Sequence, residues 1–296
     1  MIKTLLRWSP TANGAAQGAA APPDGADVGT LDSALPPSSG AVAGATAGLV
    51  HSPPSHAEVA ECLAHERFLW LDVEDPTEAD FARLQRDFGF HPLAIEDAVR
   101  TQQRPKIDEY ADYFFMVFYA VAVQPHAEVT TQQISVFLGA TYLITAHHGS
   151  SPEIAESARR WERNQVDVGR SIGAVLYSVL DSLVDHYFPV IDQLVDRIEA
   201  LEEEILSQTN RRTLAHLFAM KRDLLRLRRV LGPERDVLNV LIRRDSPVVD
   251  PQTGLYLQDV YDHVIRVIDT VDLYRDLLSG ALDAYLSVTS NNLNQV

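Results

Sequence analysis

Residues 256–296 read YLQDVYDHVIRVIDTVDLYRDLLSGALDAYLSVTSNNLNQV, and this stretch decides the architecture of the chain. Its apolar residues recur at alternating intervals of four and three positions, which is typical of a helix packed lengthwise against other helices. They are Val260, Val264, Val267, Val271, Tyr274, Leu278, Ala281, Tyr285 and Val288. One continuous helix of this length would extend over roughly 60 Å, at about 1.5 Å per residue.

A second pattern lies on the opposite face of the expected helix. Asp262, Asp269, Asp276 and Asp283 follow one another at intervals of one heptad. This acidic stripe fits either a solvated outer face or the lining of an ion path, and the sequence leaves both open. The stretch contains no helix stop signal at its end, so we expect the helix of the natural protein to continue.

Composition limits the classes of function. The formal net charge of −16 argues against nucleic acid as a partner, because phosphates would be repelled. The single Cys62 excludes an intramolecular disulfide framework and favours a reducing compartment. The longest dense apolar run, Phe114 to Val123, is ten residues long, whereas a membrane-spanning helix needs roughly twenty.

Four segments are expected along the chain. Residues 1–55 are rich in Ala, Gly, Pro and Ser and predict a disordered tail. Residues 56–166 predict an α/β (α+β) domain with a mixed sheet flanked by helices. Residues 167–254 predict a long helical hairpin, and residues 255–296 the long final helix.

Within the α/β domain, Phe68–Val73 reads as a buried strand, and Thr77 with Asp80 as the capping box of a helix that ends at Gly89. A short helix is expected from Pro92 to Val99, and another from about Pro152 to Arg163. Three strands joined by short connections predict an antiparallel meander: Tyr113–Val123, Val129–Leu138 and Tyr142–Ala146.

The helical hairpin carries opposite charges on its two arms. From Asp181 to Glu204 there are eight acids and one base, Arg197, whereas the arm that follows Thr209-Asn210 is basic except for Asp223. We expect the arms to pack antiparallel with complementary charges. Pro189 predicts a bend, Pro233 predicts a break, and residues 246–254 predict a loop.

Several polar groups are candidates for a site. His147-His148 follows a strand and fits a metal or acid–base role less well than a structural one. Phosphate-binding loops, nucleophile elbows and Cys/His zinc spacings are absent from the sequence, so we expect neither an enzyme nor catalytic residues. The acids Glu96, Asp97, Asp181 and Asp259 suit Mg²⁺ or Ca²⁺ if the fold brings them together.

Residues 65–296 resemble the CorA family of divalent-cation transporters. The resemblance rests on several motifs in the family's order, none of them specific alone. They are HPLAIED (91–97), QRPK (103–106), YSVLDSLVD (177–185), LEEE (201–204), KRDL (221–224) and DVYDH (259–263), with further matches around Asp269, Asp276, Asp283 and Asn291.

The resemblance implies the cytoplasmic domain of a homopentamer at the inner face of the cell membrane, ahead of two membrane helices. In the family, Mg²⁺ bound between neighbouring cytoplasmic domains holds the channel closed. The positions matching this regulatory site are Asp97 with Asp259, and Glu96 with Asp181 as second-site acids. Asp283 and Asn294 match pore-proximal positions. The ion implied is Mg²⁺, regulatory and transported, with Co²⁺ or Ni²⁺ as further cargo.

Two alternatives stay open at this point. A zinc transporter of the ZntB type has the same architecture, although the Asp97/Asp259 pair favours the CorA side. A soluble acidic coiled-coil interaction protein would also display the heptads and the net charge.

Overall fold

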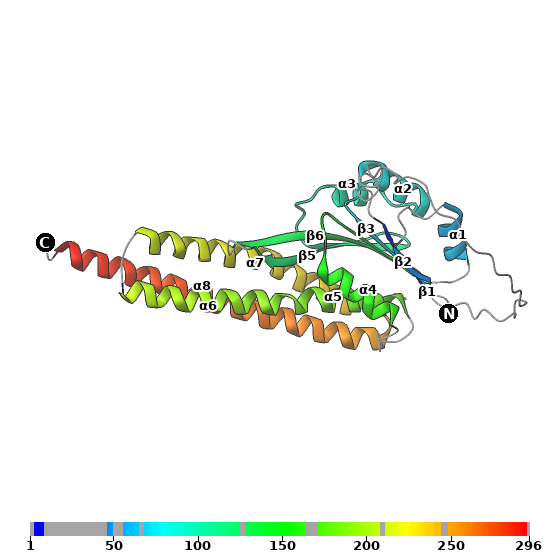
Figure 1. Cartoon of the computed structure of the whole chain (residues 1–296). Helices are drawn as coiled ribbons and strands as arrows, with labels where there is room; N and C mark the ends of the chain where they lie inside the picture. The colour runs from blue at the N-terminus through cyan, green and yellow to red at the C-terminus, as the bar shows by residue number, and fades with distance from the viewer. Residues whose placement is uncertain are drawn as a thin grey trace, which may run out of the picture.

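A seven-stranded mixed sheet lies between two layers of helices in the described part of the chain (Figure 1). The computed structural model describes residues 3–8, 46–49, 56–64, 68–124, 128–163, 171–207, 211–243 and 248–294. The strand order is β2-β1-β3-β7-β6-β5-β4. The strands are β1 (Lys3–Trp8), β2 (Thr46–Leu49), β3 (Phe68–Glu74), β4 (Lys106–Glu109), β5 (Tyr113–Val123), β6 (Val129–Gly139) and β7 (Tyr142–His147).

The expected meander is confirmed. Strands β5, β6 and β7 pair antiparallel in sequence order, with Phe115 opposite Phe137 and Phe137 opposite Ile144. Strand β3 then pairs parallel with β7, so the predicted buried strand lies inside the sheet. Because both faces of these strands are covered by helices, β5 and β7 are buried continuously along most or all of their length rather than at alternate residues.

Two strands lie in the segment for which composition predicts a disordered tail. Strand β1 pairs parallel with β3, and β2 pairs parallel with β1. The expectation of disorder is therefore wrong for Lys3–Trp8 and Thr46–Leu49. The physical reason is tertiary: the free edge of β3 offers backbone donors and acceptors to any extended segment nearby. The rest of residues 1–55 lies outside the described residues.

The upper layer of Figure 1 consists of helices α1 (His56–Ala64), α2 (Glu78–Phe88) and α3 (Pro92–Val99). The predicted capping box of α2 is present, because the Thr77 hydroxyl accepts from the backbone N–H of Asp80 and the Asp80 carboxylate accepts from that of Thr77. Gly89 ends this helix in the left-handed conformation, at φ 72°.

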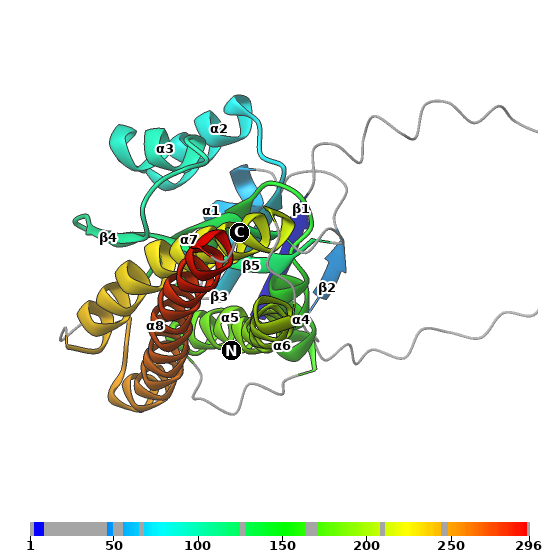
Figure 2. The ribbon, with the colours of Figure 1, turned by 90° about the vertical axis from the view of Figure 1, so that its left-hand side faces the viewer.

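The lower layer consists of α4 (Pro152–Glu162), α5 (Ile172–Asp185), α6 (Tyr187–Ser207), α7 (Arg211–Arg243) and α8 (Pro251–Asn294). Figure 2 shows α2 and α3 on the side of the sheet away from α5, α6 and α8. The predicted bend at Pro189 appears as a division between α5 and α6 at His186. A proline ring obstructs the carbonyl four residues before it, here that of Asp185.

Helix α8 confirms the predicted seam and corrects its start. Val260, Val264, Val267, Val271 and Leu278 are buried against the helices of the same chain. The helix begins at Pro251 rather than after Gly254. The Asp250 carboxylate accepts a hydrogen bond from the backbone N–H of Thr253 at 2.8 Å. Pro251 fits the first turn because a backbone N–H at that position would have no partner within the helix.

Helix α7 corrects one further expectation. It continues through Pro233 without the predicted break, because a proline inside a helix costs one hydrogen bond, and packing on both sides compensates for that loss here. The hairpin arms are antiparallel (Figure 1), and complementary charges meet near their ends, where Glu204 of α6 lies 3.5 Å from His216 of α7 and within electrostatic reach of Arg212. A second ion pair has the reverse arrangement, since Arg197 of the acidic arm lies 3.7 Å from Asp223 of the basic arm. The predicted turn at residues 209–210 lies outside the described residues.

Candidate functional site

Asp97 lies on α3 and forms an ion pair with Lys106 of β4. Lys106 Nζ lies 2.5 Å from an oxygen of Asp97 and 2.5 Å from one of Asp108. Burial alone would lower the pKa of Lys106, but its hydrogen bonds to both carboxylates raise the pKa above the ordinary value. A cation therefore already occupies the neighbourhood of Asp97. The neighbouring Glu96 forms a surface ion pair with Arg100, in which a carboxylate oxygen lies 2.6 Å from a guanidinium nitrogen.

Asp259 lies on α8, on the other side of the sheet. Its side chain is 64% exposed, and its nearest described ionic neighbour is His263, with Nε2 at 3.8 Å. Nδ1 of the same histidine lies 3.8 Å from Asp185 of α5 and has no hydrogen-bond partner. Asp259 is thus the most exposed of the four candidate metal ligands, and its carboxylate is accessible to a ligand from outside the chain.

Asp181 of α5 shares that neighbourhood. Its carboxylate accepts from Arg160 at 3.1 Å, and burial, followed by the charge of Asp185, raises its pKa. Burial and the nearby carboxylates of Asp181, Asp259 and Asp185 raise the pKa of Tyr177 to about 12. One phenol is therefore within electrostatic reach of three acids, two of them predicted from the sequence.

The four predicted metal ligands thus fall into two groups within one chain. Glu96 and Asp97 belong to the layer of α3, and Asp181 and Asp259 belong to the interface of α5 and α8. Among the described residues, no group of three or more His, Cys, Asp or Glu side chains is arranged to hold a metal. Asp97 and Asp259 lie on separate elements, and no interaction among the described residues joins them.

The acidic stripe of α8 is exposed in the single chain. Asp262, Asp269, Asp276 and Asp283 all lie on the outer surface of the helix, away from the seam. This arrangement fits both expectations for the stripe, since an ion path formed between copies would also appear as an exposed face. Asn294 is the last residue of α8, and its side chain lies outside the described residues.

The histidine pair at the end of β7 has a structural role at its first member, His147, which is the last residue of the strand. His147 is buried, with Nε2 3.2 Å from Asp72 and Nδ1 2.8 Å from the Gly149 carbonyl. Thr145 donates to the same Asp72 oxygen at 2.7 Å. Burial disfavours the charged imidazole, but the hydrogen bond to Asp72 outweighs it, and the pKa of His147 is raised.

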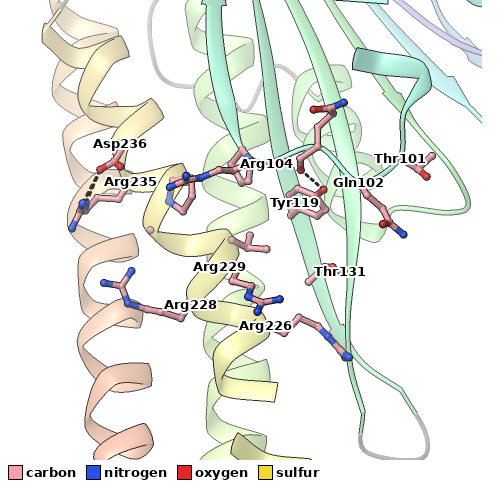
Figure 3. A pocket seen from close by; sticks show the side chains of 15 residues that line it. Thr101, Gln102, Arg104, Tyr119, Thr131, Arg226, Arg228, Arg229, Arg235 and Asp236 are labelled. Atoms are coloured by element: carbon pink, nitrogen blue, oxygen red, sulfur yellow. Dashed lines mark hydrogen bonds and ion pairs between the residues drawn. The ribbon is translucent and has the colours of Figure 1, made fainter. Parts of the chain in front are cut away.

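Two features were not predicted from the sequence. The first is a pocket of about 800 Å³ lined by five arginines, between α7 and the segment 101–105 (Figure 3). The second is Glu234, a buried carboxylic acid on α7. The arginines belong to two distant stretches, so the signal available in the sequence was only the density of arginine in residues 226–235.

Comparison with families of known proteins gives a consistent result. The family model described as CorA-like Mg²⁺ transporter protein matches residues 65–296. The chain is 33% identical over 227 residues to the putative metal ion transporter YfjQ of Bacillus subtilis (strain 168), covering 77% of this chain and 70% of that protein. It is 34% identical over 231 residues to the cobalt/magnesium transport protein CorA of Thermotoga maritima, covering 77% of this chain and 66% of that protein.

Solved structures support the same fold. The soluble domain of CorA from Methanocaldococcus jannaschii superposes with a TM-score of 0.66 at 23% identity, over 74% of this chain and 87% of that chain. The ZntB cytoplasmic domain from Vibrio parahaemolyticus superposes with a TM-score of 0.62 at 16% identity, over 75% of this chain and 88% of that chain. Within the described residues, every helix is too short or too polar to cross a membrane.

Proposed function

The chain belongs to the family of CorA-like Mg²⁺ transporter proteins, and we propose that it is the cytoplasmic metal-sensing and gating domain of a divalent-cation transporter. The family is one of transporters rather than of enzymes. The chain spans about two thirds of the length of its relatives, 70% and 66% for the two compared above. Transport of Mg²⁺, with Co²⁺ or Ni²⁺ as further cargo, is a property that we propose for the whole protein at the inner face of the cell membrane.

The observation that carries the proposal is the separation of Asp97 from Asp259. Each acid lies at the surface of a different layer of one chain, and their ligand chemistry suits a hard divalent cation. In the proposed homopentamer, Asp97 of one subunit faces Asp259 of the next. Mg²⁺ between them neutralises two carboxylates that otherwise repel each other across the interface.

The proposed gating follows from this repulsion. Bound Mg²⁺ stabilises the symmetric closed assembly, and loss of Mg²⁺ releases the interface so that the long helices can move. The metal shifts the population toward the state that it binds better. Glu96 and Asp181 act as second-site acids in this proposal, and Asp283 and Asn294 lie toward the pore.

Limited proteolysis tests the site. We expect Mg²⁺ to protect the wild-type chain and native mass measurement to detect metal-dependent oligomers. The double variant Asp97→Asn/Asp259→Asn should lose both responses. The matched control is Asp192→Asn, an exposed acid on α6 outside the candidate site and the acidic stripe, which should respond like the wild type. Unchanged Mg²⁺ protection in the double variant would show that the assignment is wrong.

The zinc-transporting alternative is less well supported. The likeness to the ZntB domain is at 16% identity and shows only a shared fold, whereas the relatives at 33% and 34% identity are named as a metal ion transporter and as a cobalt/magnesium transporter. The family match also argues against an unrelated coiled-coil interaction protein.

A further inference from the structure

The pocket of Figure 3 concentrates positive charge in an acidic protein. Its lining contains five arginines and one acidic residue, Asp236, in a chain of net charge −16. The arginines are Arg104, Arg226, Arg228, Arg229 and Arg235. A volume of about 800 Å³ is within the range of small-molecule sites.

Three of the arginines are already paired with carboxylates. Arg226 lies 3.2 Å from Glu128, and Arg228 lies 3.1 Å from Asp272 of α8. Arg235 lies 2.7 Å from Asp236. In contrast, Arg104 and Arg229 make no ion pair with any residue that the structure describes, although both line the same pocket. Their charge is therefore uncompensated in a chain that has acids in excess.

The two unpaired arginines line the same pocket from different parts of the chain, Arg104 from the segment 101–105 and Arg229 from α7. In Figure 3, Arg229 projects from α7 toward the strand that carries Tyr119, and Arg104 reaches from its loop toward α7. Arg228 and Arg235 project in the other direction, toward α8. Arg229 thus lies on the side of α7 that faces the sheet, and Arg104 enters the pocket from the segment beside it.

Both walls are fixed by hydrogen bonds before any ligand binds. The hydroxyl of Tyr119 donates to the Gln103 carbonyl at 2.5 Å, and the Gln103 N–H donates to the Gln133 side chain at 2.9 Å. The backbone next to Arg104 is therefore held in place. The backbone N–H of Tyr119 donates to Glu234 of α7 at 2.8 Å, which holds the other wall. A preorganised site loses less entropy when it binds.

We propose that this pocket binds a soluble polyphosphate anion, such as the phosphate chain of a nucleotide, with Arg104 and Arg229 as its main ligands. Planar guanidinium groups donate two parallel hydrogen bonds to a phosphate, and a chain of phosphates offers several such groups to the arginines of one pocket. Thr101, Gln102 and Thr131 supply neutral polar groups around the pocket. The proposal is independent of the metal site, because the ligand is an anion and the residues are different.

Calorimetric titration in metal-free buffer tests it, with tripolyphosphate and ATP as the two probes. We expect saturable one-to-one binding by the wild-type chain that weakens as salt increases. Arg104→Gln and Arg229→Gln should each weaken binding about tenfold, since hydrogen bonds to charged groups are the strong ones. Equal affinity for both probes indicates recognition of the phosphate chain alone, and tighter binding of ATP indicates an added contact to the nucleoside.

The matched control is Arg222→Gln, an exposed arginine on α7 outside the pocket, which should bind like the wild type. Unchanged thermal unfolding of each variant shows that the fold is intact. The proposal is overturned if the wild type binds neither probe at millimolar concentration, or if Arg222→Gln weakens binding as much as Arg229→Gln does. Since metal is absent throughout, neither result bears on the Mg²⁺ proposal.

Discussion

The carboxyl group of Glu234 accepts a hydrogen bond from the backbone N–H of Tyr119 at 2.8 Å, deep between α7 and the sheet. The hydroxyl of Tyr187 lies 2.9 Å from the other carboxyl oxygen and 2.5 Å from the Tyr119 carbonyl. Burial raises the pKa of Glu234 to about 8 from an ordinary 4.5, although the hydrogen bonds from Tyr119 and Tyr187 oppose the shift. The group is therefore protonated near neutral pH.

The raised pKa of Glu234 predicts that the free energy of unfolding decreases as the pH rises. The raised pKa means that the folded state holds a proton that the unfolded state has released between about pH 4.5 and pH 8. The contribution of Glu234 is fully present below pH 4.5 and is lost as the pH rises through about 8. Glu234 makes the free energy of unfolding fall by at most about 1.4 kcal/mol per pH unit.

Glu234→Gln should remove that slope, because an amide of the same shape does not titrate. Urea unfolding at several pH values would give the free energy of unfolding of both proteins. We expect the wild type to lose stability relative to the variant between about pH 5 and pH 8. Parallel pH profiles would contradict the burial of an ionisable group at this position.

Gly173→Ala should destabilise the contact between α5 and the start of α8. A Cβ at position 173 would lie 2.5 Å from the backbone carbonyl oxygen of Val248. Overpacking of this kind costs about 1–3 kcal/mol, more than the gain of up to about 1 kcal/mol that alanine brings to a helix. The free energy of unfolding in urea measures the difference.

Gly280→Ala is the matched control within α8, and it should have the opposite sign. A Cβ there meets no atom within 4 Å. We therefore expect a gain of about 0.5–1 kcal/mol from helix propensity alone. If both substitutions stabilise the protein, the close approach at Gly173 is not maintained in solution.

Asp250→Ala should weaken the start of α8 by about 1 kcal/mol, because the helix loses the acceptor for the Thr253 N–H. Asp250→Asn keeps an acceptor oxygen at the same place, so its loss should be smaller. Hydrogen exchange of the first turn of α8 would locate the effect. Equal protection in the wild type and the alanine variant would show that the cap contributes nothing.

Lys106→Met should increase the affinity for Mg²⁺ in the proposed regulatory site. Lys106 lies 2.5 Å from Asp97, so its ammonium group competes with a metal for the same carboxylate. Removing the ammonium group leaves the negative charge of Asp97 to be neutralised by the metal. The Mg²⁺ concentration that gives half-maximal protease protection measures the change, with Lys221→Met as a control on α7. A higher requirement for Mg²⁺ in Lys106→Met would indicate that the lysine positions Asp97 instead.

Local signals in the sequence predicted much of the fold. The capping box of Thr77 and Asp80, the meander after Tyr113 and the seam of α8 each depend on neighbours within a few residues, and all three are confirmed. The acids of the candidate site were located on their elements through a family resemblance. Their meeting across subunits stays a prediction, because it depends on a second chain.

Features that depend on distant partners were missed. The pocket joins Arg104 to Arg229, more than a hundred positions apart, and no periodicity connects them. Helix α7 continues through Pro233 because buried residues on either side hold it, whereas the proline alone predicts a break. Strand β1 forms because β3 offers an edge, which the composition of residues 1–55 does not reveal.

Helix α8 is long enough that a small rotation at one end produces a large displacement at the other. Its 44 residues extend over roughly 66 Å, and the buried seam attaches it to α5, α6 and α7 of its own chain as far as Tyr285. Sliding of α8 alone would expose the apolar seam to water, which costs free energy. A rotation of about 5° around the end at Asp250 would displace the far end by roughly 6 Å. A small change of angle near Gly173 and Asp259 would therefore displace the far end of α8 by several ångströms.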